Sequence, residues 1–284
     1  MELRIATCRP LPEPDADEDL LLAALAAEGV QARMADWRDP REDWDAPVAT
    51  VVRSTWDYLH HVDEFLAWIE RAARAAPLWN PPDVMRWNAH KFYLRELATE
   101  GFPIVPTAFV ERGSRALLAE LLGVRGWDDA VVKPTVSAVS FATLRVRTAR
   151  NDELAAGESH LRMLAATRDV LVQRYAPAVE SSGERALVWI DGELTHAIRK
   201  EPRFADGHER VSGALAIADD ERALAERILA RFGRALLYGR VDVVRDGLGR
   251  PQVMELELLE PSLFLAQHPP ALARLAHALR ARLE

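Results

Sequence analysis

Several features are scarce or missing in this chain of 284 residues, and each absence argues against a class of protein. Cys8 is the only cysteine, so an intrachain disulfide is impossible and a reducing, cytoplasmic compartment is expected. No basic segment followed by an apolar stretch resembles a signal peptide, and no run of about 18 apolar residues predicts a transmembrane helix. Low-complexity tracts are also absent. We therefore expect a globular protein of one to three domains.

Basic residues are also fewer than acidic ones. Lys and Arg total 36 against 44 Asp and Glu, which gives a net charge of -8. Such a chain is a poor candidate for binding nucleic acid or an anionic membrane. The eight histidines show no metal-ligand spacing, and no Gly-x-Ser-x-Gly or Ser-His-Asp arrangement is present. The expected partners are small molecules, with a homo-oligomer left open.

The C-terminal stretch 236–259 predicts a β-hairpin, because two apolar-rich runs flank an Asp-Gly turn signal. Acidic and apolar residues alternate in the second run, so Glu255 and Glu257 point to the same face. The pairing strand brings Asp242 towards that face. Converging carboxylates need a positive charge between them, and Mg²⁺ prefers such oxygen ligands. A solvated outer face of an antiparallel sheet gives the same pattern and stays an open alternative.

The first part of the chain alternates strand and helix patterns, which predicts an open α/β unit with a parallel sheet. The strands are expected at 3–7, 30–35 and 48–52, and the helices at 15–28 and 62–75. In such sheets, ligands bind beyond the carboxyl ends of the strands. Arg53, Ser54, Trp56 and Asp57 follow the third strand and are therefore predicted to contact the substrate. A structural Arg-Asp pair beside a packed Trp56 is the alternative.

After a proline-rich linker at 77–82, further strands and helices follow. Asn88 is expected to cap a helix that carries Lys91 at its start. Lys133 lies within an apolar strand, where a lysine is costly unless it pairs with an anion. The other expected elements are helices at 114–122, 219–236 and from 270, strands at 130–134, 144–147 and 169–173, a hairpin at 184–200 and a polar loop at 201–213.

This order of motifs resembles the ATP-grasp superfamily, and within it bacterial glutathione synthetase. The segments that carry the resemblance are 88–91, 131–134, 172–179, 185–193, 240–244 and 255–261. A closer resemblance, to the small ATP-grasp ligases that close the ring of D-cycloserine, lies in 53–58 and 255–265. The implied fold is an α/β (α+β ATP-grasp) architecture. It would comprise an N-terminal open parallel α/β domain (1–78), an ATP-grasp small subdomain (79–176) and a C-terminal catalytic subdomain (177–284).

The resemblance implies a ligase that phosphorylates a small carboxylate with ATP and lets an amine displace the phosphate, between molecules or within one amino-acid-derived substrate. In this family pattern, the ATP phosphates are bound by Lys91, Lys133 and Ser140, and the adenine and ribose by Gln173, Arg174, Tyr175, Ala176 and Glu180. Mg²⁺ or Mn²⁺ is bound by Asp242, Glu255 and Glu257. The resemblance further implies catalytic roles for Arg185 and Lys200 and contacts to the acceptor from Arg53, Ser54, Asp57 and Arg203.

Two departures from the family pattern keep other functions open. The loop at 137–143 contains no glycine, although the family usually places a glycine-rich loop there. Glu257 stands where the third metal ligand is usually Asn. A small-acid kinase that stops at the acyl phosphate and a nucleotide-binding module without catalysis therefore remain alternatives.

Overall fold

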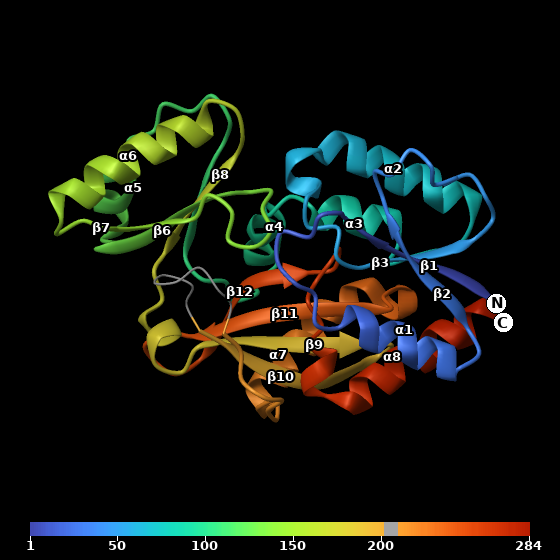
Figure 1. Ribbon diagram of the computed structural model, residues 1–284. Coiled ribbons are helices and arrows are strands. Elements are labelled where there is room, and N and C mark those ends of the chain that lie inside the picture. The colour runs from blue at the N-terminus through green and yellow to red at the C-terminus, as the bar shows by residue number, and fades with distance from the viewer. Residues whose placement is uncertain (202–209) are drawn as a thin grey trace.

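The computed structural model describes residues 1–201 and 210–284, and its described strands form three four-stranded sheets (Figure 1). The N-terminal sheet is parallel, with the order β2-β1-β3-β4. Its strands are β1 (Glu2–Thr7), β2 (Gln31–Asp36), β3 (Ala49–Val52) and β4 (Leu78–Trp79), and its helices are α1 (Glu18–Ala27) and α2 (Val62–Ala75). The predicted parallel α/β unit is therefore confirmed, with β4 as an additional strand.

The second sheet is antiparallel and lies at the upper left of Figure 1, with the order β5-β8-β6-β7. It consists of β5 (Thr107–Val110), β6 (Asp129–Pro134), β7 (Leu144–Arg147) and β8 (Val170–Arg174). Helices α5 (Leu118–Arg125) and α6 (Asn151–Ala165) cover one face, because the alternate positions Ala130, Val132 and Val146 are apolar and fully buried against them. The opposite face carries Lys133 and Gln173.

The third sheet contains both predicted hairpins, in the antiparallel order β10-β9-β11-β12. Its strands are β9 (Glu184–Ile190), β10 (Glu193–Lys200), β11 (Tyr238–Arg245) and β12 (Pro251–Glu257). Helix α7 (Asp219–Leu229) packs on one face through the cluster that includes Leu187 and Val241. Helix α8 (Pro269–Leu283) covers only part of the other face, where Ala186 and Val188 lie. The remainder of that second face is left for polar side chains.

Three local predictions are wrong. The linker at 77–82 contains β4 and the start of α3 (Pro82–Asn88). Asn88 ends α3 instead of capping the next helix, α4 (Tyr93–Thr99). The helix expected at 219–236 stops at Leu229 and continues as a 3-10 segment (Ala230–Ala235), where Gly233 leaves helical geometry with a φ of 56°. Further 3-10 turns occur at Tyr58–His60, Pro177–Glu180 and Leu265–Gln267.

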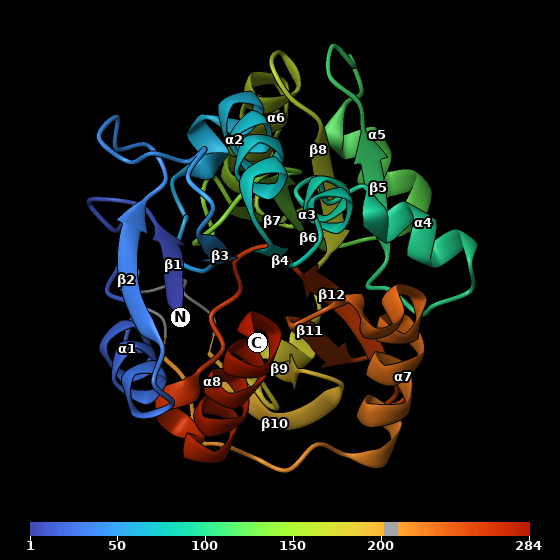
Figure 2. The ribbon, with the colours of Figure 1, turned by 90° about the vertical axis from the view of Figure 1, so that its right-hand side faces the viewer.

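The N-terminal unit and the third sheet share one apolar core. Leu25 on α1 and Leu279 on α8 belong to the same buried cluster as Val51 on β3 and Val188 on β9. Figure 2 shows α1 and α8 side by side below the parallel sheet. Since β4 straddles the expected 78/79 boundary, the domain limits at 78/79 and 176/177 stay a proposal. Across the described ranges, no helix is long and apolar enough to cross a membrane.

The side chain of Asn80 joins these two parts. It is fully buried; its amide nitrogen donates to the carbonyls of Tyr238 and Leu258, both at 2.8 Å, and its oxygen accepts from the Leu237 amide at 2.7 Å. A buried amide that satisfies several backbone groups leaves all of them unpaired when it is removed. Asn80 therefore fixes the strand that carries the acidic residues.

We expect Asn80→Ala to lower the free energy of unfolding by about 2–4 kcal/mol, since it leaves buried backbone groups unpaired and opens a small cavity. Asn151→Ala, at an exposed position at the start of α6, is the matched control and should change stability by less than about 0.5 kcal/mol. Urea unfolding measures both. Equal effects of the two substitutions would contradict this role.

Candidate active site

A cavity of about 470 Å³ opens where the three sheets meet. The N-terminal unit contributes Trp56 and Tyr58, the second sheet Lys133 and Gln173, and the third sheet an array of charged side chains. The charged lining residues are Glu13, Lys91, Lys133, Arg174, Glu184, Lys200, Glu201, Arg240, Glu255, Glu257 and Glu260. The cavity thus brings together residues from all three sheets.

The outer edge of β12 pairs with the backbone of residues 103–105 at Val253 and with side chains further along. Asn88 donates to the Leu256 carbonyl at 2.8 Å and accepts from the Leu258 amide at 2.6 Å. The Tyr93 hydroxyl accepts from the Leu256 amide at 2.9 Å. An edge strand otherwise exposes unpaired backbone groups, so these contacts fix the α3–α4 connection against β12. Because that connection carries Lys91, they also set the position of this lysine beside Glu255.

Lys91 and Lys133 meet at a shared anion, the Glu255 carboxylate. Lys91 Nζ lies 2.9 Å from Glu255 Oε1, and Lys133 Nζ lies 3.6 Å from Glu255 Oε2. Lys91 also donates to the carbonyl and hydroxyl oxygens of Ser137, at 2.7 and 3.0 Å. Burial raises the pKa of Glu255, but the two ammonium groups outweigh it and hold the pKa below its usual range. The anion here is the protein's own carboxylate.

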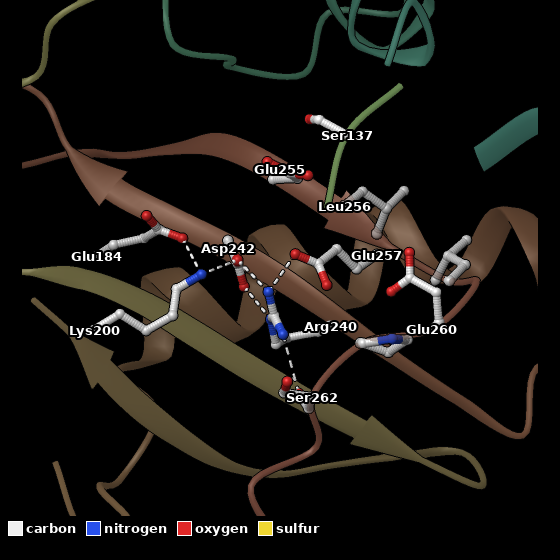
Figure 3. Close-up of polar contacts among 12 residues, drawn as sticks. Ser137, Glu184, Lys200, Arg240, Asp242, Glu255, Leu256, Glu257, Glu260 and Ser262 are labelled. Atoms are coloured by element: carbon white, nitrogen blue, oxygen red, sulfur yellow. Dashed lines mark hydrogen bonds and ion pairs between the residues drawn. The ribbon is translucent and has the colours of Figure 1, made fainter. Parts of the chain in front are cut away.

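Arg240 and Lys200 neutralise the other acidic residues of the face (Figure 3). Arg240 binds Asp242 through two nitrogens at 2.7 and 2.9 Å and also pairs with Glu257. Lys200 Nζ lies 2.6 Å from Asp242 Oδ2 and 2.5 Å from Glu184 Oε1. This arrangement links the cations and carboxylates of all four strands of the third sheet in one network.

The pKa values of these groups diverge. Burial raises the pKa of Asp242, but Arg240 and Lys200 reverse that effect and hold it well below its usual range. Burial raises the pKa of Glu257 to about 8 and that of Glu184 to about 7, since their cationic partners compensate only in part. The pKa of Lys200 is lowered by burial and raised more strongly by Asp242 and Glu184. Proton binding and ion pairing are therefore interdependent on this face.

The strand periodicity placed Asp242, Glu255 and Glu257 on one face, and the register confirms it: Asp242 lies opposite Glu255, and Glu257 lies opposite Arg240. Within the described residues, however, no three acidic, His or Cys side chains are grouped as a metal site. The positive charge between the carboxylates comes from Arg240 and Lys200. The donor set itself consists of carboxylate oxygens, which fits Mg²⁺.

The loop at 137–143 reaches the cavity despite its lack of glycine. Val139, Ser140 and Ala142 have positive φ values of 53°, 57° and 51°. These values lie in the left-handed region that glycine adopts without steric cost. Ser140 lines the cavity, and the ring of Phe141 contacts His60 of the N-terminal unit edge-on, with centroids 5.2 Å apart. The loop therefore has the backbone conformation typical of glycine without containing one.

The segment 173–176, assigned to adenine by resemblance, lines the cavity beside the second sheet. The backbone amides of Arg174 and Tyr175 already donate to Pro106 and Asp129, at 2.8 and 2.9 Å. The Gln173 side chain donates to Thr107 at 3.1 Å. Ala176 also lines the cavity, and among the described residues no backbone carbonyl accepts a hydrogen bond from its amide.

Glu180, assigned to the ribose, is not brought to the cavity, whose lining includes the neighbouring Val179 instead. Its carboxylate accepts from the Tyr175 hydroxyl at 2.7 Å and from Arg145 at 2.6 Å. The Arg145 guanidinium in turn lies 3.5 Å from the centre of the Tyr175 ring. These contacts indicate that Glu180 helps to hold the Tyr175 ring in place.

Arg185 is not brought to the cavity. It lies on the α7 face of β9, where its guanidinium pairs with the buried Glu221 at 3.0 Å and donates to the Ala216 carbonyl at 2.7 Å. Its neighbour Glu184 points to the cavity, because successive residues of a strand face opposite ways. The predicted catalytic position of Arg185 is therefore wrong, whereas Lys200 does line the cavity.

Three of the residues predicted to contact the substrate are also structural. Arg53 is buried and donates to the Pro261 carbonyl at 2.8 Å, Ser54 bonds to Thr7, and Asp57 accepts from Trp37. None of the three is among the residues that line the cavity. Arg203 lies outside the described residues. The structure therefore fits a structural role of this segment better than contact with the substrate. The expected Arg-Asp pair is not formed, however, because Asp57 pairs with Trp37 and not with Arg53.

Sequence reasoning assigned no role in the site to several lining residues, among them Tyr58, Glu184, Arg240 and Glu260. Trp56 and Tyr58 lie in the same segment as the structural residues Arg53, Ser54 and Asp57, and since residues 53–57 form neither strand nor helix, no periodicity separates the two sets. Glu260 follows the alternating acids of β12 after two leucines, so strand periodicity no longer predicts its direction.

The comparisons with known proteins agree with this geometry. A family model described as the N-terminal domain of D-cycloserine synthetase DcsG matches residues 3–80. The cycloserine biosynthesis protein DcsG of Streptomyces lavendulae is 36% identical over 285 residues, covering 95% of each chain. A crystal structure of D-cycloserine synthetase DcsG has a TM-score of 0.90 and 35% identity, covering 100% of both chains. An ATP-grasp RimK domain protein from Sphaerobacter thermophilus shares the fold, with a TM-score of 0.71 and 22% identity over 97% of this chain and 98% of its own. The resemblance to ATP-grasp ligases and the predicted fold class are confirmed.

The position of Arg185 can be tested by stability. We expect Arg185→Met to lower the free energy of unfolding by about 1–3 kcal/mol, since Glu221 is 1% exposed and, among the described residues, retains only Arg245 as an ionic partner. Arg222→Met removes a surface ion pair of 3.6 Å and should cost less than about 1 kcal/mol. Thermal and urea unfolding compare the two. A marked loss of nucleotide affinity in the Arg185 variant, with stability unchanged, would restore the catalytic assignment.

Proposed function

Because this chain belongs to the DcsG family of ATP-grasp ligases and is an ATP-dependent carboxylate–amine ligase, we propose that it joins the two groups within one amino-acid-derived substrate. The proposed product is a ring closed by a C–N bond, as in D-cycloserine. The observation that carries the proposal is the cavity in which Lys91, Lys133, Lys200 and Arg240 face a row of carboxylates. Both signs of charge are available there for phosphoryl transfer.

The reaction has two steps. A substrate carboxylate oxygen attacks the γ-phosphorus of ATP, and the bond to the β–γ bridging oxygen breaks to release ADP. The substrate nitrogen then attacks the acyl carbon, phosphate leaves with the bonding electrons, and the nitrogen loses a proton to give the amide. An acyl phosphate is hydrolysed readily, so the residues that enclose the cavity must also exclude water.

In this proposal, Lys91 and Lys133 hold the ATP phosphates, and the loop at 137–143 covers them with Ser140 as a hydrogen-bond donor. Each lysine now pairs with Glu255. Phosphate oxygens are stronger competitors for an ammonium group than a single carboxylate, because they carry more charge. Gln173, Arg174, Tyr175 and Ala176 line the part of the cavity that would receive the adenine.

Asp242, Glu255 and Glu257 would hold Mg²⁺, or Mn²⁺. When bound, the ion would neutralise phosphate charge and orient the γ-phosphate. Arg240 and Lys200 would then move from the carboxylates towards the acyl phosphate, whose negative charge they can stabilise. These cations lie on the same face as the carboxylates they neutralise, so only side-chain rotation is needed.

The proposed metal requirement is tested directly. ADP release should depend on added Mg²⁺ or Mn²⁺ and stop with EDTA, and Glu255→Gln should lower turnover by roughly two to four orders of magnitude, as expected when charge stabilisation is lost. Coupled ADP and amide assays measure the effect, with Glu193→Gln on an exposed part of β10 as the control. Near-normal turnover of Glu255→Gln would refute the assignment. ADP and acyl phosphate without amide would instead indicate a kinase.

The lysine assignment predicts a loss of nucleotide affinity. Lys133→Ala should weaken ATP binding by roughly 1.5–3 kcal/mol, which is typical of a charge-assisted hydrogen bond. Arg147→Ala, on β7 and paired with Glu153, is the control and should bind ATP like the parent. Isothermal titration calorimetry with a non-hydrolysable ATP analogue separates binding from turnover. Equal affinities of parent and Lys133→Ala would contradict the role.

A further inference from the structure

Glu260 differs from the other acidic groups that line the cavity. Its side chain is 9% exposed, and it forms no ion pair with any Lys or Arg of the described residues. Lys91 and Arg240 act on it only from beyond ion-pairing distance, and the Tyr58 hydroxyl is a polar neighbour of its carboxyl group. A buried carboxylate without a cation is costly. Its presence in the cavity therefore needs an explanation outside the network around Asp242.

The backbone that carries Glu260 is fixed residue by residue. Side chains from distant parts of the chain donate to five consecutive carbonyls: Asn80 to Leu258 at 2.8 Å, Tyr238 to Leu259 at 2.9 Å, Trp56 to Glu260 at 3.1 Å, Arg53 to Pro261 at 2.8 Å and Arg240 to Ser262 at 3.1 Å. A segment held in this way loses little entropy when a ligand binds to it. The Glu260 carboxylate is thus a preorganised group.

The surroundings of Glu260 favour a cation. Trp56 and Tyr58 line the same cavity, and aromatic faces attract ammonium groups. Figure 3 shows the carboxylates of Glu257 and Glu260 side by side, with Arg240 next to Glu257. Because Arg240 and the lysines already have anionic partners, the anionic end of a substrate would lie towards them and a cationic end towards Glu260.

We propose that Glu260, together with Tyr58 and Trp56, forms a binding subsite for a primary ammonium group of the substrate. This inference rests on the proposed function, because an amino-acid-derived substrate carries an α-ammonium group in addition to the nitrogen that closes the ring. An ammonium ion paired with a carboxylate keeps its proton and has no free lone pair. The subsite would therefore keep the α-amino group protonated, orient the α-carbon and leave the other nitrogen as the nucleophile.

The test compares two probes that differ only in this group. O-amino-D-serine is D-cycloserine with its ring C–N bond opened by water, and 3-(aminooxy)propanoic acid is the same molecule without the α-amino group. Calorimetry in the presence of Mg²⁺ and a non-hydrolysable ATP analogue measures the binding of each probe to the parent and to Glu260→Gln. Glu193→Gln, which is exposed on β10, is the charge-matched control.

Glu260→Gln should weaken binding of O-amino-D-serine roughly 10–100-fold, the range of a charge-assisted hydrogen bond, and leave the des-amino probe nearly unchanged. A folding defect would affect both probes equally, and equal losses or no loss would overturn the inference. Turnover of the parent is measured separately by ADP release. If the parent binds the first probe through Glu260 but releases no ADP, the proposed function fails and the subsite stands. If the Glu260→Gln variant closes the ring as fast as the parent, the ammonium subsite is refuted and the proposed function stands.

Discussion

The pairing of buried carboxylates with buried cations on one face of the third sheet is the constraint on which the rest of the structure depends. Asp242 and Glu255 cannot be desolvated alone, so the fold brings Lys200 and Arg240 to the first and Lys91 and Lys133 to the second. These cations come from the third sheet, from β6 of the second sheet and from the connection between α3 and α4. The charge network therefore requires the parts to meet in one arrangement.

The same pairing has a consequence for ligand binding. In the proposed function, the cations exchange carboxylates for phosphates, and the carboxylates exchange Lys and Arg for Mg²⁺. A nucleotide that arrives with its metal brings both signs of charge, so the exchange leaves little net charge buried. Either component alone would leave one set of charges without partners. The network thus favours joint binding of nucleotide and metal over the binding of either one alone.

Much of the fold could be predicted from the sequence because local patterns determine it. The alternation of acids and apolar residues in β12 predicted the face of Glu255 and Glu257, and the Asp-Gly turns predicted both hairpins. Arg185 was misplaced because its direction depends on the register of β9 against β11. Ala186 is the residue that lies opposite Asp242, so Arg185 must face α7.

The roles of the buried asparagines could not be predicted, for a related reason. Asn88 occurs in a stretch that fits a helix cap, yet its amide pairs with a strand 168 and 170 residues further along the chain. Neither propensity nor periodicity contains information about so distant a partner. The same holds for Arg53, whose acceptor is the Pro261 carbonyl, 208 residues away.

The loop at 137–143 shows how a family feature can persist without its usual residues. Glycine is common in phosphate-binding loops because a left-handed backbone costs it nothing, whereas another residue there costs on the order of 1–2 kcal/mol. Val139, Ser140 and Ala142 all adopt that conformation. The contacts that can offset the cost come from outside the loop: Ser137 is held by Lys91, and Phe141 lies against His60 and Arg168. The conformation is thus maintained by tertiary contacts, and the contact of Phe141 with His60 couples the loop to the 3-10 turn Tyr58–His60, which carries Tyr58 of the proposed ammonium subsite.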